Sequence, residues 1–266
     1  MIASTVSAVR RRQSGSIRGK IKEIAGDDGW AGLFSRGTAF AYRSTLRRLM
    51  PYVGHLNYSE VLIARKRRLF DRSLPFIYSL TCDIGDYEGT LIEQLRRHVR
   101  LGDRVVVVGG GYGVTVVHAA RLAGPKGTVT CFEGAAAYAN NVREAARINQ
   151  VGARVTVHHA IVAEAISVYE SAHSNTTVAP EELPDCDVLE LDCEGAELQV
   201  VRKMAIRPRV MLIETHGVHG ASTADVRLAM EGLGYSVRDA GVAEPRQADY
   251  CAMQDIRILV GLRCNP

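Results

Sequence analysis

Residues 104–113 have the sequence RVVVVGGGYG, and this stretch decides the fold. Its four consecutive valines are too few for a helix of their own and are followed by glycine, which predicts a buried strand of a parallel sheet. Residues 114–123 are mostly small and apolar and stop at a Gly-Pro pair, which predicts a helix. A strand, a glycine turn and a helix in immediate succession form one βα unit of a nucleotide-binding sheet.

The same alternation of strands and helices extends outward from this unit. An apolar stripe at helical spacing behind Asp86 predicts a helix before the first strand, with Asp86 as its N-cap. Ser222 or Thr223 is expected to cap a later helix that ends near Gly232 or Gly234. The whole pattern predicts an α/β domain with a seven-stranded, mostly parallel sheet. The expected strands are 104–108, 128–132, 154–158, 188–191, 210–213, 235–238 and 256–260.

Composition places the chain among ordinary globular proteins. It has 266 residues, of which 47% are hydrophobic and 23% charged. No run approaches the roughly 18 to 20 apolar residues that span a bilayer, and residues 1–20 lack the apolar core of a signal peptide, so we expect a cytoplasmic protein. The six cysteines are scattered without a C-x-x-C pair, which favours reduced and mostly buried thiols over disulfides or a zinc site.

The net charge of +4 conceals two regions of opposite sign. Residues 1–72 carry 15 Lys and Arg against 5 Asp and Glu, whereas residues 73–266 carry 18 against 24. We therefore predict a basic, mainly helical N-terminal extension over residues 1–80 and an α/β domain over 81–266. The extension is either a solvated helical segment or a surface that attracts phosphate, nucleic acid or acidic lipid.

The glycine loop and a following acid indicate a nucleoside ligand. The loop has the spacing G-x-G-x-G, and Val114 stands where the dinucleotide fingerprint has its last glycine, which argues against NAD. Glu133 ends the next strand, 20 residues after Gly113, where a carboxylate can accept hydrogen bonds from ribose hydroxyls. A tight turn without a ligand is the alternative interpretation of the glycines alone.

Two acidic clusters follow the fourth and fifth expected strands. Because ligands of open α/β sheets bind beyond the carboxyl ends of the strands, these side chains are expected to converge there. Taken singly, each is explained equally well as a helix-capping carboxylate or a surface residue. The first cluster comprises Glu190, Asp192, Glu194 and Glu197, and the second comprises Glu214, His216 and His219.

Four strings in this order resemble the FkbM family of S-adenosylmethionine-dependent methyltransferases over about residues 81–263. They are VVVVGGGYG, TCFEG, VLELDCEGAEL and RVMLIETHG. The resemblance implies a class I, Rossmann-like methyltransferase fold with strand order 3-2-1-4-5-7-6 and the last strand antiparallel. It also implies O-methylation of sugars or of hydroxyls on other small molecules.

Carried over position by position, the resemblance implies a cofactor site. The loop glycines would pass the methionine part of the cofactor, Glu133 would hold the ribose, and Ala160 and Ile161 would lie along the adenine. Gly134 and Asp192 are further candidates for cofactor binding. The family's usual acid in the first strand is replaced by Val107, so we expect Glu88 or Asp86 to contact the amino acid end instead. The loop glycines are Gly109, Gly110, Gly111 and Gly113.

The candidate catalytic residues are Asp192, Glu194, Glu214 and His216, with no metal ion expected. A hydroxyl acceptor needs a base, whereas a carboxylate acceptor does not, and the residues leave this choice open. An RNA methyltransferase that uses the basic extension and a non-catalytic cofactor-binding domain are the alternative functions. A glycan or small-molecule acceptor is the expected partner.

Overall fold

The computed structural model describes residues 37–38, 40–70, 83–162 and 176–264. The chain forms two compact units. The first takes in residues up to 54 together with 67–82, and the second takes in residues 55–66 together with 83–266. The predicted division at residue 80 stays a prediction, but residues 55–66 pack with the second unit.

The second unit contains a seven-stranded sheet among the described residues, with the order β10-β11-β9-β8-β3-β4-β5. Strands β3, β4, β5, β8 and β9 run parallel, and β11 is antiparallel to both of its neighbours. In order along the chain this is 3-2-1-4-5-7-6, as the resemblance implies. The strands are β3 (Arg104–Val108), β4 (Thr128–Glu133), β5 (Val155–His159), β8 (Val188–Leu191), β9 (Val210–Glu214), β10 (Tyr235–Val242) and β11 (Arg257–Arg263).

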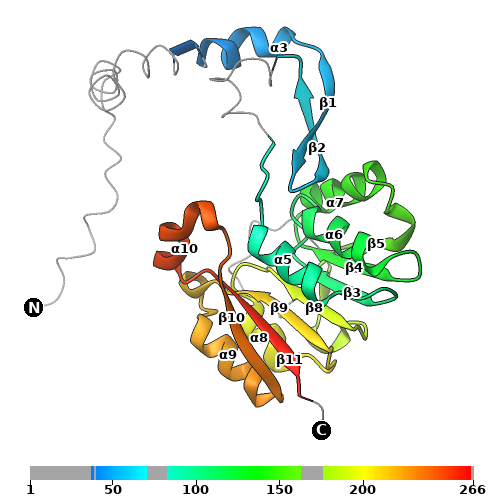
Figure 1. Ribbon diagram of the computed structural model, residues 1–266, viewed down its shortest axis with the longest axis vertical. Helices are drawn as coiled ribbons and strands as arrows, with labels where there is room; N and C mark the ends of the chain where they lie inside the picture. Colours follow the sequence, from blue (N-terminus) through cyan, green and yellow to red (C-terminus); the bar gives the residue numbers. More distant parts are fainter. Residues whose placement is uncertain (1–36, 39, 71–82, 163–175, 265–266) are drawn as a thin grey trace, which may run out of the picture. The chain divides into compact units, whose positions relative to one another are not determined.

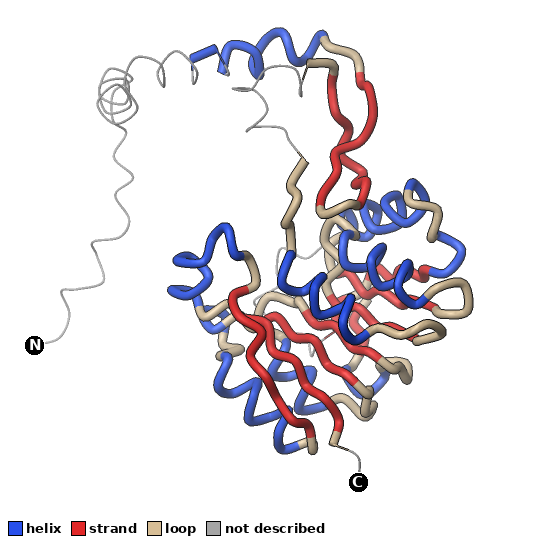
Figure 2. Tube along the Cα trace, in the orientation of Figure 1, coloured by secondary structure: helices blue, strands red, loops and turns tan. Residues whose placement is uncertain are grey.

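Helices cover both faces of this sheet (Figures 1 and 2). Alternate valines of β3 divide between two cores: Val105 and Val107 pack with one helical layer, and Val106 and Val108 with the other. Burial on both faces explains why the strand is uniformly apolar. One layer is α5 (Gly89–His98), α6 (Val114–Ala123) and α7 (Ala136–Ile148); the other is α8 (Glu197–Lys203) and α9 (Thr223–Gly232).

All seven expected strands are therefore confirmed, as is one of the two expected helix caps. Ser222 precedes α9 and accepts a hydrogen bond from the backbone N–H of Asp225. Asp86 does not cap α5. The N-cap is Glu88, in a left-handed conformation with φ 51°, and it makes no side-chain capping bond.

The structure differs from the expected helical extension over residues 52–68. A π-helical segment, η1 (Tyr42–Leu46), and α3 (Arg47–Leu49) are followed by a β-hairpin of β1 (Tyr52–Tyr58) and β2 (Val61–Arg68). Ser59 and Glu60 both have positive φ, as a two-residue hairpin turn requires. Alternate residues around this turn are buried, including Leu56, Tyr58, Val61 and Ile63, so the period is two rather than 3.6.

The hairpin tip belongs to the core of the second unit. His118 Nε2 donates to the carbonyl of Ser59 over 2.7 Å, since a carbonyl only accepts. Asn149 bonds both backbone groups of Leu62. The ring of Tyr58 packs against that of Tyr87, with centroids 5.1 Å apart. The tip thus supports the segment that leads into α5.

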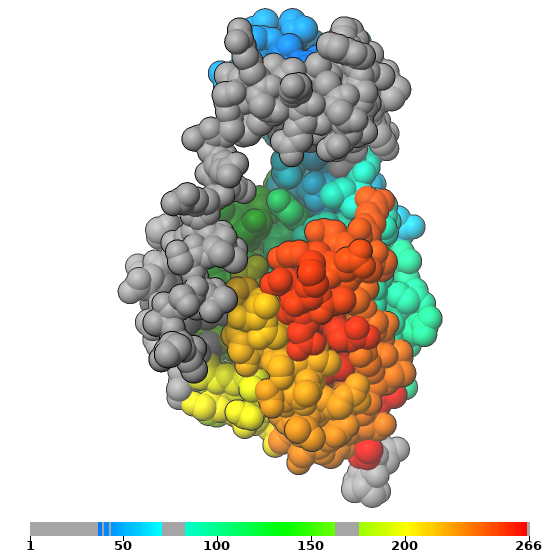
Figure 3. Space-filling model, turned by 90° about the vertical axis from the view of Figure 1, so that its left-hand side faces the viewer, coloured from blue at the N-terminus to red at the C-terminus, as the bar shows by residue number. Residues whose placement is uncertain are grey.

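Shorter elements complete the described chain. A parallel pair, β6 (Ile161–Val162) and β7 (Thr177–Val178), follows β5. Helix α10 (Ala248–Gln254) lies between β10 and β11, and the C-terminal segments form a continuous orange-to-red surface (Figure 3). The cysteines within the described ranges are free thiols, and most are buried. Among the same residues no helix has the length and apolar character needed to cross a membrane. The 3₁₀ turns are η2 (Gly152–Arg154), η4 (Pro180–Glu182), η5 (Gly217–His219) and η6 (Pro245–Gln247).

Candidate cofactor and methyl-transfer site

The glycine loop after β3 is shaped by close backbone packing. Gly109 has φ 93°, and a Cβ there would overlap the carbonyl of Asp192 at the end of the neighbouring strand. Gly113 has φ 85°, and its Cβ would meet Ala145 of α7. Gly111 has φ 49° and faces open space. Glycine is therefore required for conformation at all three positions and for packing at the first two.

The carboxylate of Glu133 organises this loop. Its Oε2 accepts hydrogen bonds from the backbone N–H groups of Gly110 (2.9 Å) and Gly111 (3.0 Å), and its Oε1 accepts from Ala135 N–H (2.8 Å). A carboxylate has about four acceptor positions, so three are in use and one is left for a ligand. Glu133 holds the loop as well as facing the place expected for a ribose.

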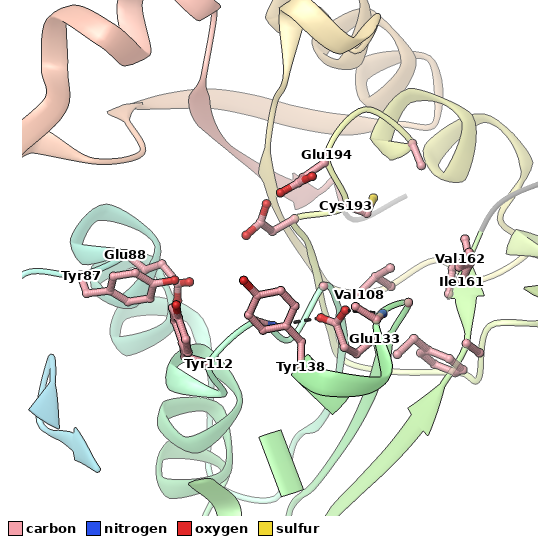
Figure 4. Close-up of a pocket in the computed structure, with 18 residues that line it drawn as sticks. Tyr87, Glu88, Val108, Tyr112, Glu133, Tyr138, Ile161, Val162, Cys193 and Glu194 are labelled. Carbon is pink, nitrogen blue, oxygen red and sulfur yellow. Dashed lines mark hydrogen bonds between the residues drawn. The ribbon is translucent and has the colours of Figure 1, made fainter. Parts of the chain in front are cut away.

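A cavity of about 440 Å³ opens beside the loop (Figure 4). Its lining includes most of the residues expected to bind cofactor: Glu88, Gly109, Gly111, Glu133, Gly134, Ala160, Ile161 and Asp192. Gly110 and Gly113 do not line the cavity and act through the backbone of the loop. The volume is within the range of small-molecule sites.

The cavity has two chemically different ends. Ile161 and Val162 lie on the side away from Tyr87, Glu88 and Tyr112 (Figure 4). The first side, with Phe132 and Ala160, is apolar and suits an aromatic base; we call it the adenosine end. The second side continues toward Asp192 and Glu194 and is acidic; we call it the transfer end.

His216 and Glu214 are not among the residues that line the cavity, but His216 lies next to Asp192 of the transfer end and is held in a fixed orientation. Its Nδ1 lies 3.0 Å from Oε1 of Glu197, a side chain with no solvent exposure. A carboxylate only accepts, so Nδ1 carries the proton and Nε2 is left with a lone pair. Nε2 lies 3.7 Å from Oδ1 of Asp192 and 3.7 Å from Oε1 of Glu214.

Burial and neighbouring charges shift the pKa values of the ionisable groups at this end. Burial is the main cause that raises the pKa of Asp192 to about 6 and that of Glu214 well above its usual range. Burial by itself lowers the pKa of His216, but the hydrogen bond with Glu197 and the charge of Asp192 outweigh it, and the net shift is upward. Groups with such displaced pKa values are typical of sites that bind charge or move protons.

Glu88 shares this environment. Its Oε2 is buried and makes no hydrogen bond with any described residue, and burial together with the charges of Asp192 and Glu190 raises its pKa well above the usual range. Val107 pairs in register with Glu190 of β8. Glu190 has no exposed surface, and burial raises its pKa to about 8. The acid that is missing at Val107 thus has a carboxyl counterpart one strand away.

Asp192, Glu214 and His216 each offer one ligand atom, and these atoms lie within 4.8 Å of one another. This spacing could hold a metal ion, although the sequence predicts none. Glu194 lines the cavity with φ 50°, whereas His219 is exposed with its ring centroid 6.4 Å from that of His216.

The sequence analysis assigned no role to Glu197 or to the tyrosines of the site. Glu197 also accepts from the backbone N–H groups of Cys193 and Gly195, so it shapes the turn as well as orienting His216. Its place in the string D-x-E-G-x-E was the available signal. Tyr87, Tyr112 and Tyr138 line the cavity, and their rings form a chain of edge contacts. Their separation in sequence left no pattern to find.

Comparison with protein families finds one relevant match. Residues 175–237, which include the turn after β8 and the strand β9, match the model described as the methyltransferase FkbM domain. No curated protein matches the chain.

Solved structures with a similar arrangement include several methyltransferases. The precorrin-6y C5,15-methyltransferase of Geobacter metallireducens GS-15 is 15% identical, with 68% of this chain and 89% of that chain covered and a TM-score of 0.46. Fibrillarin of Aeropyrum pernix, with natively bound S-adenosyl-L-methionine, is 17% identical (62% and 68% covered, TM-score 0.41). The O-methyltransferase TomG of Streptomyces achromogenes is 15% identical (73% and 84% covered, TM-score 0.43). Similarities of this degree do not bear on the acceptor or on the site residues.

Proposed function

We propose that this chain, in which residues 175–237 match the model of the methyltransferase FkbM domain, is an S-adenosylmethionine-dependent methyltransferase that methylates a hydroxyl group of a sugar or another small molecule. The observation that carries the proposal is the pair of Glu197 and His216 next to the transfer end. A buried carboxylate holds the imidazole so that its free nitrogen lies 3.7 Å from Asp192, which lines the acidic end of the cavity. That is the arrangement of a general base.

The residues present fit the cofactor. The glycine turn admits a ligand close to the backbone, and Glu133 retains an acceptor position for a ribose hydroxyl. Ala160, Ile161 and Phe132 provide an apolar wall for adenine, and Gly134 leaves room beside Ile161. Glu88 is the candidate for the ammonium of the amino acid end, because its Oε2 is buried without a hydrogen-bond partner among the described residues.

When bound, the cofactor supplies a methyl group that is already activated on a sulfonium. The chain then has to align the acceptor and remove its proton. Nε2 of His216 takes the hydroxyl proton, and Glu197 keeps the ring in place while it becomes positive. Asp192, 3.7 Å from Nε2, stabilises the imidazolium that forms. Glu214, at the same distance, is assigned to positioning the ring, and Glu194 to the wall of the site.

The acidity of the transfer end bears on the alternatives. An acceptor carboxylate or an RNA phosphate would approach Glu88, Asp192 and Glu194, which line the cavity, and like charges repel. A carboxylate acceptor also needs no base. No observation on the described residues specifically favours the RNA or the non-catalytic alternative, and both are left as outcomes of the test.

The test is transfer of tritiated methyl from S-adenosylmethionine into fractionated cell extract. Label in a base-stable ether of a glycan or small molecule supports the proposal. Label in RNA, or in an ester that mild base removes, contradicts it. Cofactor binding with no transfer into any fraction supports a non-catalytic domain. Parallel reactions with EDTA and with added Mg²⁺ are expected to differ by less than about twofold, because the proposed mechanism removes the proton without a metal ion.

A further inference from the structure

The ionisable side chains that line the cavity are acidic. Four carboxyl groups line it, from Glu88, Glu133, Asp192 and Glu194, and no Lys, Arg or His is among the described residues of the lining. A neutral nucleoside needs only hydrogen bonds from such a wall. The excess of carboxylates indicates a ligand with positive charge.

Two of these carboxylates differ in the number of hydrogen bonds that they accept. Glu133 accepts three backbone N–H groups. Asp192 accepts no hydrogen bond from any described residue, and the closest cationic group is Nε2 of His216, 3.7 Å away and without a proton when His216 acts as base. Asp192, whose side chain is 27% exposed, is therefore an acid with no hydrogen-bond donor among the described residues, and it can gain free energy by pairing with a cationic ligand.

If the cofactor binds as proposed, Asp192 lies beside the reacting sulfur. Its backbone carbonyl packs on Gly109 of the loop expected to pass the methionine part of the cofactor. Its carboxylate adjoins the nitrogen proposed to deprotonate the acceptor. Because acceptor oxygen, methyl group and sulfur must lie in line, the group between the loop and the base is next to the sulfonium.

The reaction changes the charge at this point. The bond from sulfur to methyl breaks, the bond from oxygen to methyl forms, and the hydroxyl proton passes to Nε2 of His216. The sulfur is left neutral in S-adenosylhomocysteine, while the positive charge appears on the imidazole. Asp192 adjoins the charge before and after transfer, but after His216 releases its proton the carboxylate has no cation.

We propose that Asp192 binds the positive charge of the sulfonium and thereby makes the enzyme prefer S-adenosylmethionine to its product S-adenosylhomocysteine. This inference rests on the proposed function. Tyr112 and Tyr138 also line the cavity, and their rings make an edge contact with centroids 5.7 Å apart. Product release is then favoured by loss of charge at sulfur.

The experiment is calorimetric titration of the full chain with three ligands: S-adenosylmethionine, S-adenosylhomocysteine and sinefungin, in which an amine-bearing carbon replaces the sulfonium. The two cationic ligands are expected to bind roughly 10- to 100-fold more tightly than S-adenosylhomocysteine, the range of a charge-assisted contact. In Asp192→Asn this ratio should fall to within about threefold, through weaker binding of the cationic ligands alone.

Glu133→Gln is the matched control, because it removes a carboxylate that faces a part common to all three ligands. It should weaken them equally and keep the ratio. Thermal unfolding without ligand checks that both variants fold, and Asp192→Glu, which keeps the charge, should retain a ratio above about fivefold.

Equal affinity of wild type for S-adenosylmethionine and S-adenosylhomocysteine would overturn the inference and leave the proposed function standing. A ratio unchanged in a folded Asp192→Asn would overturn the role of this residue. If none of the three ligands binds, the proposed function itself fails, and the inference with it.

Discussion

The two ends of the cavity use carboxylates in opposite ways. At the adenosine end, Glu133 accepts three hydrogen bonds, from two backbone N–H groups of the glycine loop and one of the turn after β4, and keeps one acceptor position free. At the transfer end, Asp192 and Glu214 lie around Nε2 of His216 at 3.7 Å without a hydrogen bond between them and the ring. A carboxylate that accepts several backbone hydrogen bonds holds a binding surface rigid. A carboxylate without hydrogen bonds can still gain free energy by pairing with a charged ligand. We therefore expect cofactor binding to depend mainly on the adenosine end and methyl transfer on the transfer end.

The largest expected effect follows from breaking the transfer end. His216→Gln should lower kcat by roughly 100- to 10,000-fold, because it removes the base that takes the acceptor proton. Affinity for S-adenosylmethionine, measured by calorimetry, should change by less than about threefold. A His216→Gln enzyme that turns over at nearly the wild-type rate would refute the base assignment and favour an acceptor that needs no deprotonation.

The contact that joins the two ends is expected to be the next most sensitive. Gly109→Ala should lower the free energy of unfolding by about 2 to 4 kcal/mol, since its Cβ would overlap the carbonyl of Asp192. Gly220→Ala is the matched control: Gly220 has φ 91°, close to the 93° of Gly109, but nothing lies within 4 Å of its Cβ. Denaturation in urea should show about 1 kcal/mol for the control, and equal losses would mean that the overlap relaxes without cost.

A smaller effect is expected at the adenosine end. Glu133→Gln should weaken S-adenosylmethionine binding by about 1 to 3 kcal/mol, because the charge that orders three N–H groups and receives the ribose is lost. The rate at saturating cofactor should stay within about threefold of wild type. Calorimetry gives the first quantity and initial rates the second. Unchanged affinity would remove Glu133 from the cofactor site.

The pH dependence of kcat should follow the ionisation of His216 next to the transfer end. His216 must be neutral to accept a proton, and its pKa is raised above the usual value, so kcat should increase with pH through neutrality and level off above the pKa of His216. Asp192, with a pKa of about 6, is ionised over most of that range and does not limit the profile. The expected change is about tenfold per pH unit on the acid side. A kcat that falls as pH rises would contradict the base assignment.

How far the sequence predicts this molecule depends on whether the signal is local. The four valines, the glycine turn and the acid at Glu133 are contiguous features, and the strands they predict are confirmed with the predicted order. The hairpin of residues 52–68 was missed because its turn uses Ser59 and Glu60 in left-handed conformations, where glycine or asparagine would have marked it. The run of basic residues in its second strand is also typical of the solvent-exposed face of a helix.

The site shows the same limit. The sequence predicts that the carboxylates of the site lie at strand ends, but it does not predict how many hydrogen bonds each of them accepts. Which acid would accept from His216 depended on the turn at Gly195, and the structure selects Glu197. Whether Asp192 would be hydrogen-bonded depended on donors from segments remote in sequence. These are properties of packing in three dimensions, which periodicity and spacing do not record.

The central claim, that the two ends divide binding from chemistry, is tested most directly by a single-turnover measurement. Methyl transfer from S-adenosylmethionine to the labelled acceptor fraction is followed at increasing cofactor concentration for wild type, Glu133→Gln and His216→Gln. We predict that Glu133→Gln raises the half-saturating concentration by roughly 5- to 150-fold with an unchanged limiting rate, and that His216→Gln lowers the limiting rate at least about 100-fold with an unchanged half-saturating concentration. Variants that both shift the same parameter would contradict the account.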